Sequence, residues 1–173
     1  MCGIIGILGK HEAAPILVEA LKRLEYRGYD SSGIATVESE GFIDRRRAVG
    51  KLVELQDKLV FQPLKGKVGI GHTRWATHGE PNEKNAHPHN SGAVSVVHNG
   101  IIENFLELRH ELDCDGYKPE TDTDTETIAM LCSKFIDEGH EPIAAAQKTL
   151  SKLSGSFAIA MLFAGYVNLI MAA

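Results

Sequence analysis

Two segments of the sequence constrain the fold most. Each consists of two runs of strand length joined by a short connection that contains glycine. Residues 33–38 and 42–49 flank Glu40-Gly41, and residues 157–163 and 166–172 flank Ala164-Gly165. Such connections are typical of β-hairpins. Because hairpins recur among helical segments, we expect an α+β fold with antiparallel sheets.

The second pair lies in a stretch that must also be weighed as a membrane helix. Residues 154–173 form 20 consecutive positions without a charged side chain, which is long enough to span a bilayer. Gly155, Gly165 and Asn168 interrupt the run. We therefore favour the hairpin and expect no membrane partner.

The remaining periodic segments alternate between strands and helices. We expect strands over 2–9, 68–73 and 93–98, the last ending at Asn99-Gly100, and a long polar loop over 76–92. One helix is expected to begin at Pro15 and to end near Gly28. Three more are expected over 51–59, 103–112 and 143–153. Another begins near Thr123, where Thr123 and Glu126 have the spacing of a capping box.

Composition restricts the class of protein. The chain is 43% hydrophobic and 24% charged, as expected for a globular domain, and its net charge of −5 argues against a nucleic-acid partner. The three cysteines, Cys2, Cys114 and Cys132, have no paired spacing. This pattern favours neither a disulfide scaffold nor a four-cysteine zinc site, so we expect a reduced, cytoplasmic protein.

Cys2 is the most informative single residue. If Met1 is removed, the same residue holds a thiol and a free α-amine, whose pKa of about 7.7–8.0 suits it to accept the thiol proton. Nucleophiles activated by an N-terminal amine are used in covalent catalysis. The alternative is that Cys2 is a small apolar residue at the start of a buried strand.

Two strand ends carry further candidates. In the run His72-Thr73-Arg74-Trp75-Ala76-Thr77-His78-Gly79, the Arg74 guanidinium can clamp a carboxylate through two hydrogen bonds, although a surface ion pair is equally consistent. In His98-Asn99-Gly100, the Asn99 amide and the Gly100 N–H can form an oxyanion hole, although Asn-Gly is also typical of a tight turn.

Three other patterns have simpler interpretations. The alternating Thr and acidic residues over 121–126 favour a helix cap, although one of the acids can accept from a ligand ammonium. His87-Pro88-His89 suggests a metal site, but no cysteine or carboxylate stands at zinc-ligand spacing, and we expect neither a metal nor a cofactor. We expect Arg45-Arg46-Arg47 to be a solvated strand.

Several strings together resemble one family. They are Cys2-Gly3-Ile4, the run LEYRGYDS from Leu24, the run HTRWATHG from His72, the run NAHPH from Asn85 and the run HNGIIEN from His98. They closely resemble the glutaminase domain of the glucosamine-6-phosphate synthase family, which belongs to the class II, N-terminal-nucleophile glutamine amidotransferases. The resemblance covers essentially the whole chain.

The resemblance implies a role for each matching residue. It implies that Cys2 is the nucleophile and its α-amine the base, and that Asn99 and Gly100 form the oxyanion hole. The glutamine α-carboxylate is expected at Arg74, with Trp75, Thr77 and His78 beside it, and the α-ammonium at Asp124. Arg27 is expected in a loop near the nucleophile.

The resemblance also implies a fold and a function. We expect a four-layer α/β/β/α sandwich with two antiparallel sheets. We expect hydrolysis of L-glutamine through a Cys2 thioester, with the ammonia passing in the full-length enzyme to fructose 6-phosphate in a C-terminal sugar-isomerase domain. Residues 1–173 are expected to form a type 2 glutamine amidotransferase domain that lacks its C-terminal part and the isomerase domains. A non-catalytic glutamine-binding fragment is the alternative, and oligomerisation stays open.

Overall fold

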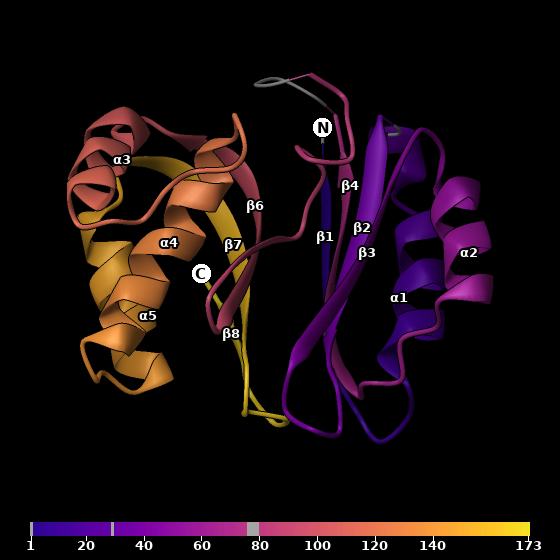
Figure 1. Ribbon diagram of the computed structural model, residues 1–173. Helices are drawn as coiled ribbons and strands as arrows, with labels where there is room; N and C mark the ends of the chain where they lie inside the picture. The colour runs from indigo at the N-terminus through magenta and orange to yellow at the C-terminus, as the bar shows by residue number, and fades with distance from the viewer. Residues whose placement is uncertain (1, 29, 76–79) are drawn as a thin grey trace.

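Two antiparallel sheets pack face to face at the centre of the molecule, and helices cover the outer face of each (Figure 1). This computed structural model describes residues 2–28, 30–75 and 80–173, except for the side chain of Arg27. The order of the layers is helices, sheet, sheet, helices (Figure 1). The arrangement confirms the expected four-layer α/β/β/α sandwich.

The first sheet carries the N-terminal half of the chain. Its strands are β1 (Gly3–Leu8), β2 (Ser31–Val37), β3 (Ile43–Val49) and β4 (Val68–Arg74), in the spatial order β1-β4-β2-β3. Its outer face is covered by α1 (Ala13–Lys22) and α2 (Leu52–Phe61) (Figure 1). Because β1 pairs antiparallel with β4, the start of β1 lies next to the end of β4.

The second sheet has the order β5-β6-β7-β8. Its strands are β5 (His89–Ser91), β6 (Val94–Ile102), β7 (Gly155–Phe163) and β8 (Ile170–Ala172). Its outer face is covered by α3 (Phe105–Cys114), α4 (Asp124–Asp137) and α5 (Pro142–Lys152) (Figure 1). The β2–β3 and β7–β8 pairings confirm both expected hairpins.

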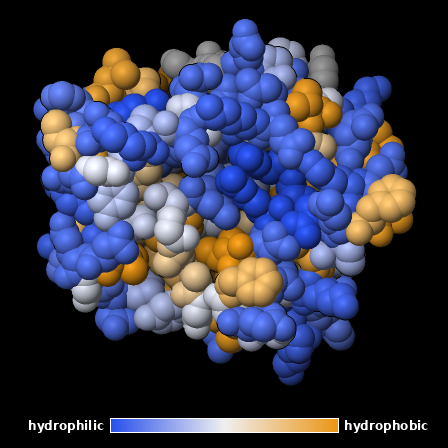
Figure 2. Space-filling view, in the orientation of Figure 1, coloured by the Kyte–Doolittle hydropathy of each residue, from blue (hydrophilic) through white to orange (hydrophobic). Residues whose placement is uncertain are grey.

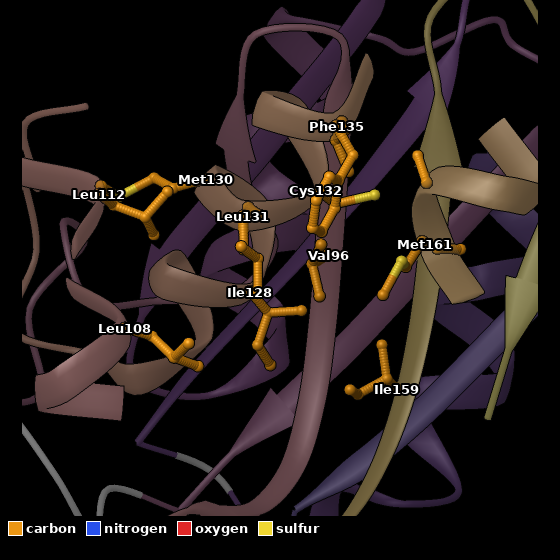
Figure 3. Packing of buried hydrophobic residues seen from close by; sticks show 14 of the residues in the cluster. Val96, Leu108, Leu112, Ile128, Met130, Leu131, Cys132, Phe135, Ile159 and Met161 are labelled. Carbon is orange, nitrogen blue, oxygen red and sulfur yellow. The ribbon is translucent and has the colours of Figure 1, made fainter. Parts of the chain in front are cut away.

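Three apolar clusters hold the four layers together, because each layer buries one face against the next. The largest packs α3, α4 and α5 against the second sheet, with Ile128, Leu131 and Met161 at its centre (Figure 3). A second lies between α1, α2 and the first sheet, and a third, including Ile70, Val97 and Leu162, lies between the two sheets. Hydrophilic residues dominate the face seen in Figure 2.

Several sequence expectations need correction. Strand β6 does not end at Asn99-Gly100 but continues to Ile102, since pairing with β7 runs through this dipeptide to Gly155. Helix α1 ends at Lys22, and a separate 3-10 helix, Glu25–Arg27, follows it. The segment expected to be a loop over 76–92 contains the short strand β5.

The three consecutive arginines of β3 are not simply solvated. They are half-buried, and Arg45 Nη1 donates to the Pro88 carbonyl at 3.0 Å. Arg47 Nη1 donates to the Ala86 carbonyl at 2.9 Å. Two of these side chains therefore hold the segment that carries His87 and His89.

None of the helices in the described ranges is both long and apolar enough to cross a membrane.

Candidate active site

The pairing of β1 with β4 brings Cys2 to the end of β4. The register places Gly3 opposite Thr73, so Cys2 lies beside the Arg74–Trp75 peptide. The Trp75 N–H donates to Cys2 Sγ at 3.2 Å, and Sγ is 3.6 Å from the Trp75 carbonyl oxygen. Cys2 is partly exposed, so a small molecule can reach it.

Asn99 reaches the same place from the second sheet. Its Nδ2 donates to the Cys2 carbonyl at 3.3 Å, and its Oδ1 lies 2.9 Å from His72 Nε2. The amide therefore bridges β6 and the N-terminal end of β1. An amide N–H beside a nucleophile is the kind of donor that stabilises an oxyanion.

Gly100 has a backbone conformation that a side chain would not tolerate. Its φ is +120°, and a Cβ built there would lie 2.1 Å from the Ser156 carbonyl oxygen. The glycine lets β6 stay paired with β7 through this position, next to the Asn99 that contacts Cys2. The Asn-Gly pair is thus a strand feature and not a turn.

Arg74 and Asp124 provide opposite charges near Cys2. Arg74 is buried, and its Nη1 donates to the Glu80 carbonyl at 3.4 Å. Burial lowers the pKa of Arg74, and the negative charges of Cys2, Asp30 and Asp124 oppose that decrease. Cys2 and Asp124 are therefore both close enough to Arg74 for their charges to act on it. The opposite charges of Arg74 and Asp124 suit a ligand that carries both a carboxylate and an ammonium group.

Asp124 is the first residue of α4. Its Oδ2 accepts a hydrogen bond from the Ile102 N–H at 3.0 Å, and its Oδ1 is 3.7 Å from His98 Nδ1. The helix N-terminus also favours a negative charge at this position. The carboxylate is therefore held by both the helix and the second sheet.

The capping box predicted at this helix does not form. Thr123 stands at the N-cap position but makes no side-chain cap hydrogen bond. The Glu126 carboxylate instead accepts from the N–H groups of Glu120 at 2.8 Å and Thr121 at 2.7 Å. It therefore orders the segment before the helix.

Behind the site lies a cluster of four buried histidines: His72, His87, His89 and His98. The rings of His72 and His87 are stacked with centroids 4.2 Å apart, and those of His87 and His89 meet edge to face at 4.7 Å. Burial lowers the pKa of each of the four, and lowers that of His72 to about 4. These imidazoles are therefore neutral at neutral pH.

The histidine cluster has no arrangement suited to a metal. Within the described ranges, no group of three or more His, Cys, Asp or Glu side chains could hold a metal ion. The sequence pattern drew attention to His87 and His89, but only as metal candidates. The contact of His72 with Asn99 was missed, although His72 shares a face of β4 with Arg74 by the two-residue period of a strand.

The structure describes only some of the other predicted site residues. Trp75 follows β4 and is 44% exposed. Thr77 and His78 lie outside the described residues, and of Arg27 only the backbone, in the 3-10 helix, is described. Gly28 packs tightly on the site, since a Cβ there would lie 2.9 Å from the Arg74 carbonyl carbon.

A trough leads away from Cys2 and Asn99. It has a volume of about 950 Å³ and runs between β1 and the strands β7 and β8. Its lining is mainly apolar, with Ile4, Ile159 and Ile170 among the contributors. Cys2 therefore lines a space between the edges of the two sheets.

Comparison with known proteins agrees with this geometry. A family profile described as "Glutamine amidotransferase domain" matches residues 72–173. Curated relatives described as glutamine–fructose-6-phosphate aminotransferase (isomerizing) include those of Mesorhizobium japonicum, 57% identical, and Brucella suis, 58% identical, both over 173 residues. The alignments cover 100% of this chain and 28% of each relative, so the chain spans little more than a quarter of their length.

Solved structures share the fold. Glutamine phosphoribosylpyrophosphate amidotransferase from B. subtilis, in complex with ADP and GMP, superposes with a TM-score of 0.80 at 28% identity, covering 94% of this chain and 35% of that one. A structure described as the allosteric regulatory enzyme of purine biosynthesis gives a TM-score of 0.80 at 30% identity, with the same coverage.

Proposed function

Because the chain belongs to the glutamine amidotransferase domain family, we propose that it hydrolyses L-glutamine to glutamate and ammonia with Cys2 as the nucleophile. The observation that carries the proposal is the position of Cys2 Sγ, which accepts from the Trp75 N–H at 3.2 Å, beside the Asn99 amide. A partly exposed thiol with one N–H donor on its sulfur and an amide donor on the carbonyl of the same residue suits acyl transfer.

Glutamine is held by its α-groups in this proposal. Arg74 binds the α-carboxylate and Asp124 the α-ammonium, an assignment supported by their opposite charges and by the effect of the Asp124 charge on the pKa of Arg74. Trp75, Thr77, His78 and Arg27 complete the pocket. With both ends of the amino acid fixed, the side-chain amide is presented to the thiol, which reduces the entropic cost of attack.

The chemistry follows from these positions once Met1 is removed. The α-amine of Cys2 takes the thiol proton, and the thiolate attacks the side-chain carbonyl carbon. The oxyanion is held by Asn99 Nδ2 and the Gly100 N–H. The C–N bond breaks, and the leaving nitrogen takes the proton from the α-ammonium and departs as ammonia. Water then attacks the thioester, the α-amine takes its proton, the C–S bond breaks and glutamate leaves.

A longer polypeptide supplies the acceptor for the ammonia. The curated relatives are named for amino transfer to fructose 6-phosphate, and the chain spans 28% of their length. Residues 1–173 therefore belong, in this proposal, to a type 2 glutamine amidotransferase domain. The ammonia passes to fructose 6-phosphate in a sugar-isomerase domain of the same polypeptide.

The test combines intact mass with a glutamine-mimicking diazo-ketone. Protein that lacks Met1 should gain a single adduct at Cys2, glutamine should slow the reaction, and glutamate release should fall to background in Cys2→Ala. Cys114→Ala is the matched control, because Cys114 is an exposed cysteine outside the site, and it should retain the adduct and the activity. Release that persists in Cys2→Ala, or no release by wild-type protein that lacks Met1, would contradict the proposal.

A further inference from the structure

His72 lies inside the molecule, where the end of β4 faces β6 of the other sheet. It is 1% exposed, and its Nε2 lies 2.9 Å from Asn99 Oδ1 and 3.2 Å from the His98 carbonyl oxygen. No step of the proposed hydrolysis uses it. Among the described residues of the site, the Asn99 side chain is the one to which His72 is hydrogen-bonded.

The partners of the ring determine which nitrogen carries the proton. A backbone carbonyl only accepts, so the His98 carbonyl requires a proton on His72 Nε2. The Asn99 amide leads to the same result independently. Its nitrogen must face the Cys2 carbonyl, another pure acceptor, which leaves Oδ1 to face His72. Two separate acceptors therefore demand the Nε2–H tautomer.

The ring is also fixed in space. His87 stacks on it with an interplanar angle of 22°, and His87 Nε2 lies 2.7 Å from Thr125 Oγ1 on α4. Among the described residues, His72 Nδ1 has no hydrogen-bond partner. The Nε2 side is thus the only side of this ring that the described residues hold by hydrogen bonds.

We propose that His72 is a positioning residue: its Nε2–H holds Asn99 Oδ1, so that the amide NH2 of Asn99 faces Cys2 and the developing oxyanion. The inference rests on the proposed function. Asn99 Nδ2 has two hydrogens, and the Cys2 carbonyl accepts one of them. The other is then available to the oxyanion.

Losing His72 removes the shorter of the two hydrogen bonds that orient the amide, 2.9 Å against 3.3 Å, and leaves only the one to the Cys2 carbonyl. An Asn amide rotated by 180° would present its oxygen to the oxyanion, and repulsion would replace the hydrogen bond. Loss of one oxyanion donor lowers kcat by about 10²–10³-fold. We therefore expect His72→Leu to lower kcat by roughly 100-fold with little change in KM, because Arg74 and Asp124 still hold the substrate.

The experiment compares three variants with the wild-type protein. His72→Gln keeps an N–H donor at about the reach of Nε2 and should recover at least about tenfold of the kcat lost in His72→Leu. His89→Leu is the matched control, because it also removes a buried histidine, one that contacts Thr123 and not Asn99. It should keep kcat within about threefold of wild type. Glutamate, which forms no oxyanion, should bind wild type and His72→Leu equally.

A second measurement needs no variant. Nitrogen-15 NMR of the wild-type imidazoles should show His72 as the neutral Nε2–H tautomer. An Nδ1–H tautomer, or a folded His72→Leu variant with wild-type kcat, would overturn the inference. Failure of the proposed function looks different, because wild-type protein that lacks Met1 would then release no glutamate while the tautomer is as expected.

Discussion

Replacing Gly100 by alanine tests whether the fold requires glycine at this position. The φ of +120° is unfavourable for an L-residue with a side chain, which costs about 1–3 kcal/mol. The new Cβ would lie 2.1 Å from the Ser156 carbonyl oxygen, well inside the 3.0 Å that real Cβ contacts keep. Strands β6 and β7 must move apart, and such misfit costs about 1–3 kcal/mol more.

The two contributions together predict that Gly100→Ala lowers the free energy of unfolding by about 4 kcal/mol. Natural domains have about 5–15 kcal/mol in total, so the variant should be close to unfolding at 37 °C. Urea unfolding followed by circular dichroism measures the loss. The slope of the transition with urea should be unchanged if only stability is affected.

Gly139→Ala is the matched control. Gly139 has a φ of +90°, but nothing lies within 4 Å of the Cβ that would be added. It should therefore show the backbone cost alone, about 1 kcal/mol. If the two variants lose the same stability, the clash with Ser156 makes no contribution, and the reasoning for Gly100 is wrong.

Three further predictions follow from the same structure. Because burial lowers the pKa of His72 from 6.5 to about 4, the unfolded chain binds a proton more readily than the folded one below pH 6.5. Urea titrations should show the full free energy of unfolding above pH 6.5, and His72 should account for a loss of about 3 kcal/mol of it as the pH falls towards 4. A free energy of unfolding that does not change over this range would refute the prediction. Ile128→Ala should cost about 2–5 kcal/mol of unfolding free energy, since Ile128 is fully buried, while Ile143→Ala, at a half-exposed position, should cost well under half as much. Asp124→Asn should raise the Kd for glutamine in calorimetry at least about tenfold by removing the charge that pairs with the α-ammonium, and an unchanged Kd would remove Asp124 from the binding site.

The hairpins were predictable from sequence because their determinants are local. Gly41 and Gly165 both have positive φ values at the connections, and apolar runs flank them, so pairing follows from neighbours in the chain. The length of β6 was not predictable in this way. Asn99-Gly100 has the local chemistry of a turn, and only pairing with β7, some 60 residues later in the chain, carries the strand through it.

The candidate site, like the fold, could be predicted from the sequence only in part. Distinctive runs named Cys2, Arg74 and Asn99 as candidates. The run around Asp124 favoured a helix cap, and only the family resemblance predicted a substrate contact for that residue. Three other features depended on tertiary structure. Strands β1 and β4 are neighbours, Asn99 reaches Cys2 from the second sheet, and His72 holds the Asn99 amide. The sequence by itself determined which groups are available and where the two hairpins turn, since these are properties of a few adjacent residues. Only strand pairing and the packing of the two sheets decided which groups meet, since each contact joins segments that the chain keeps far apart.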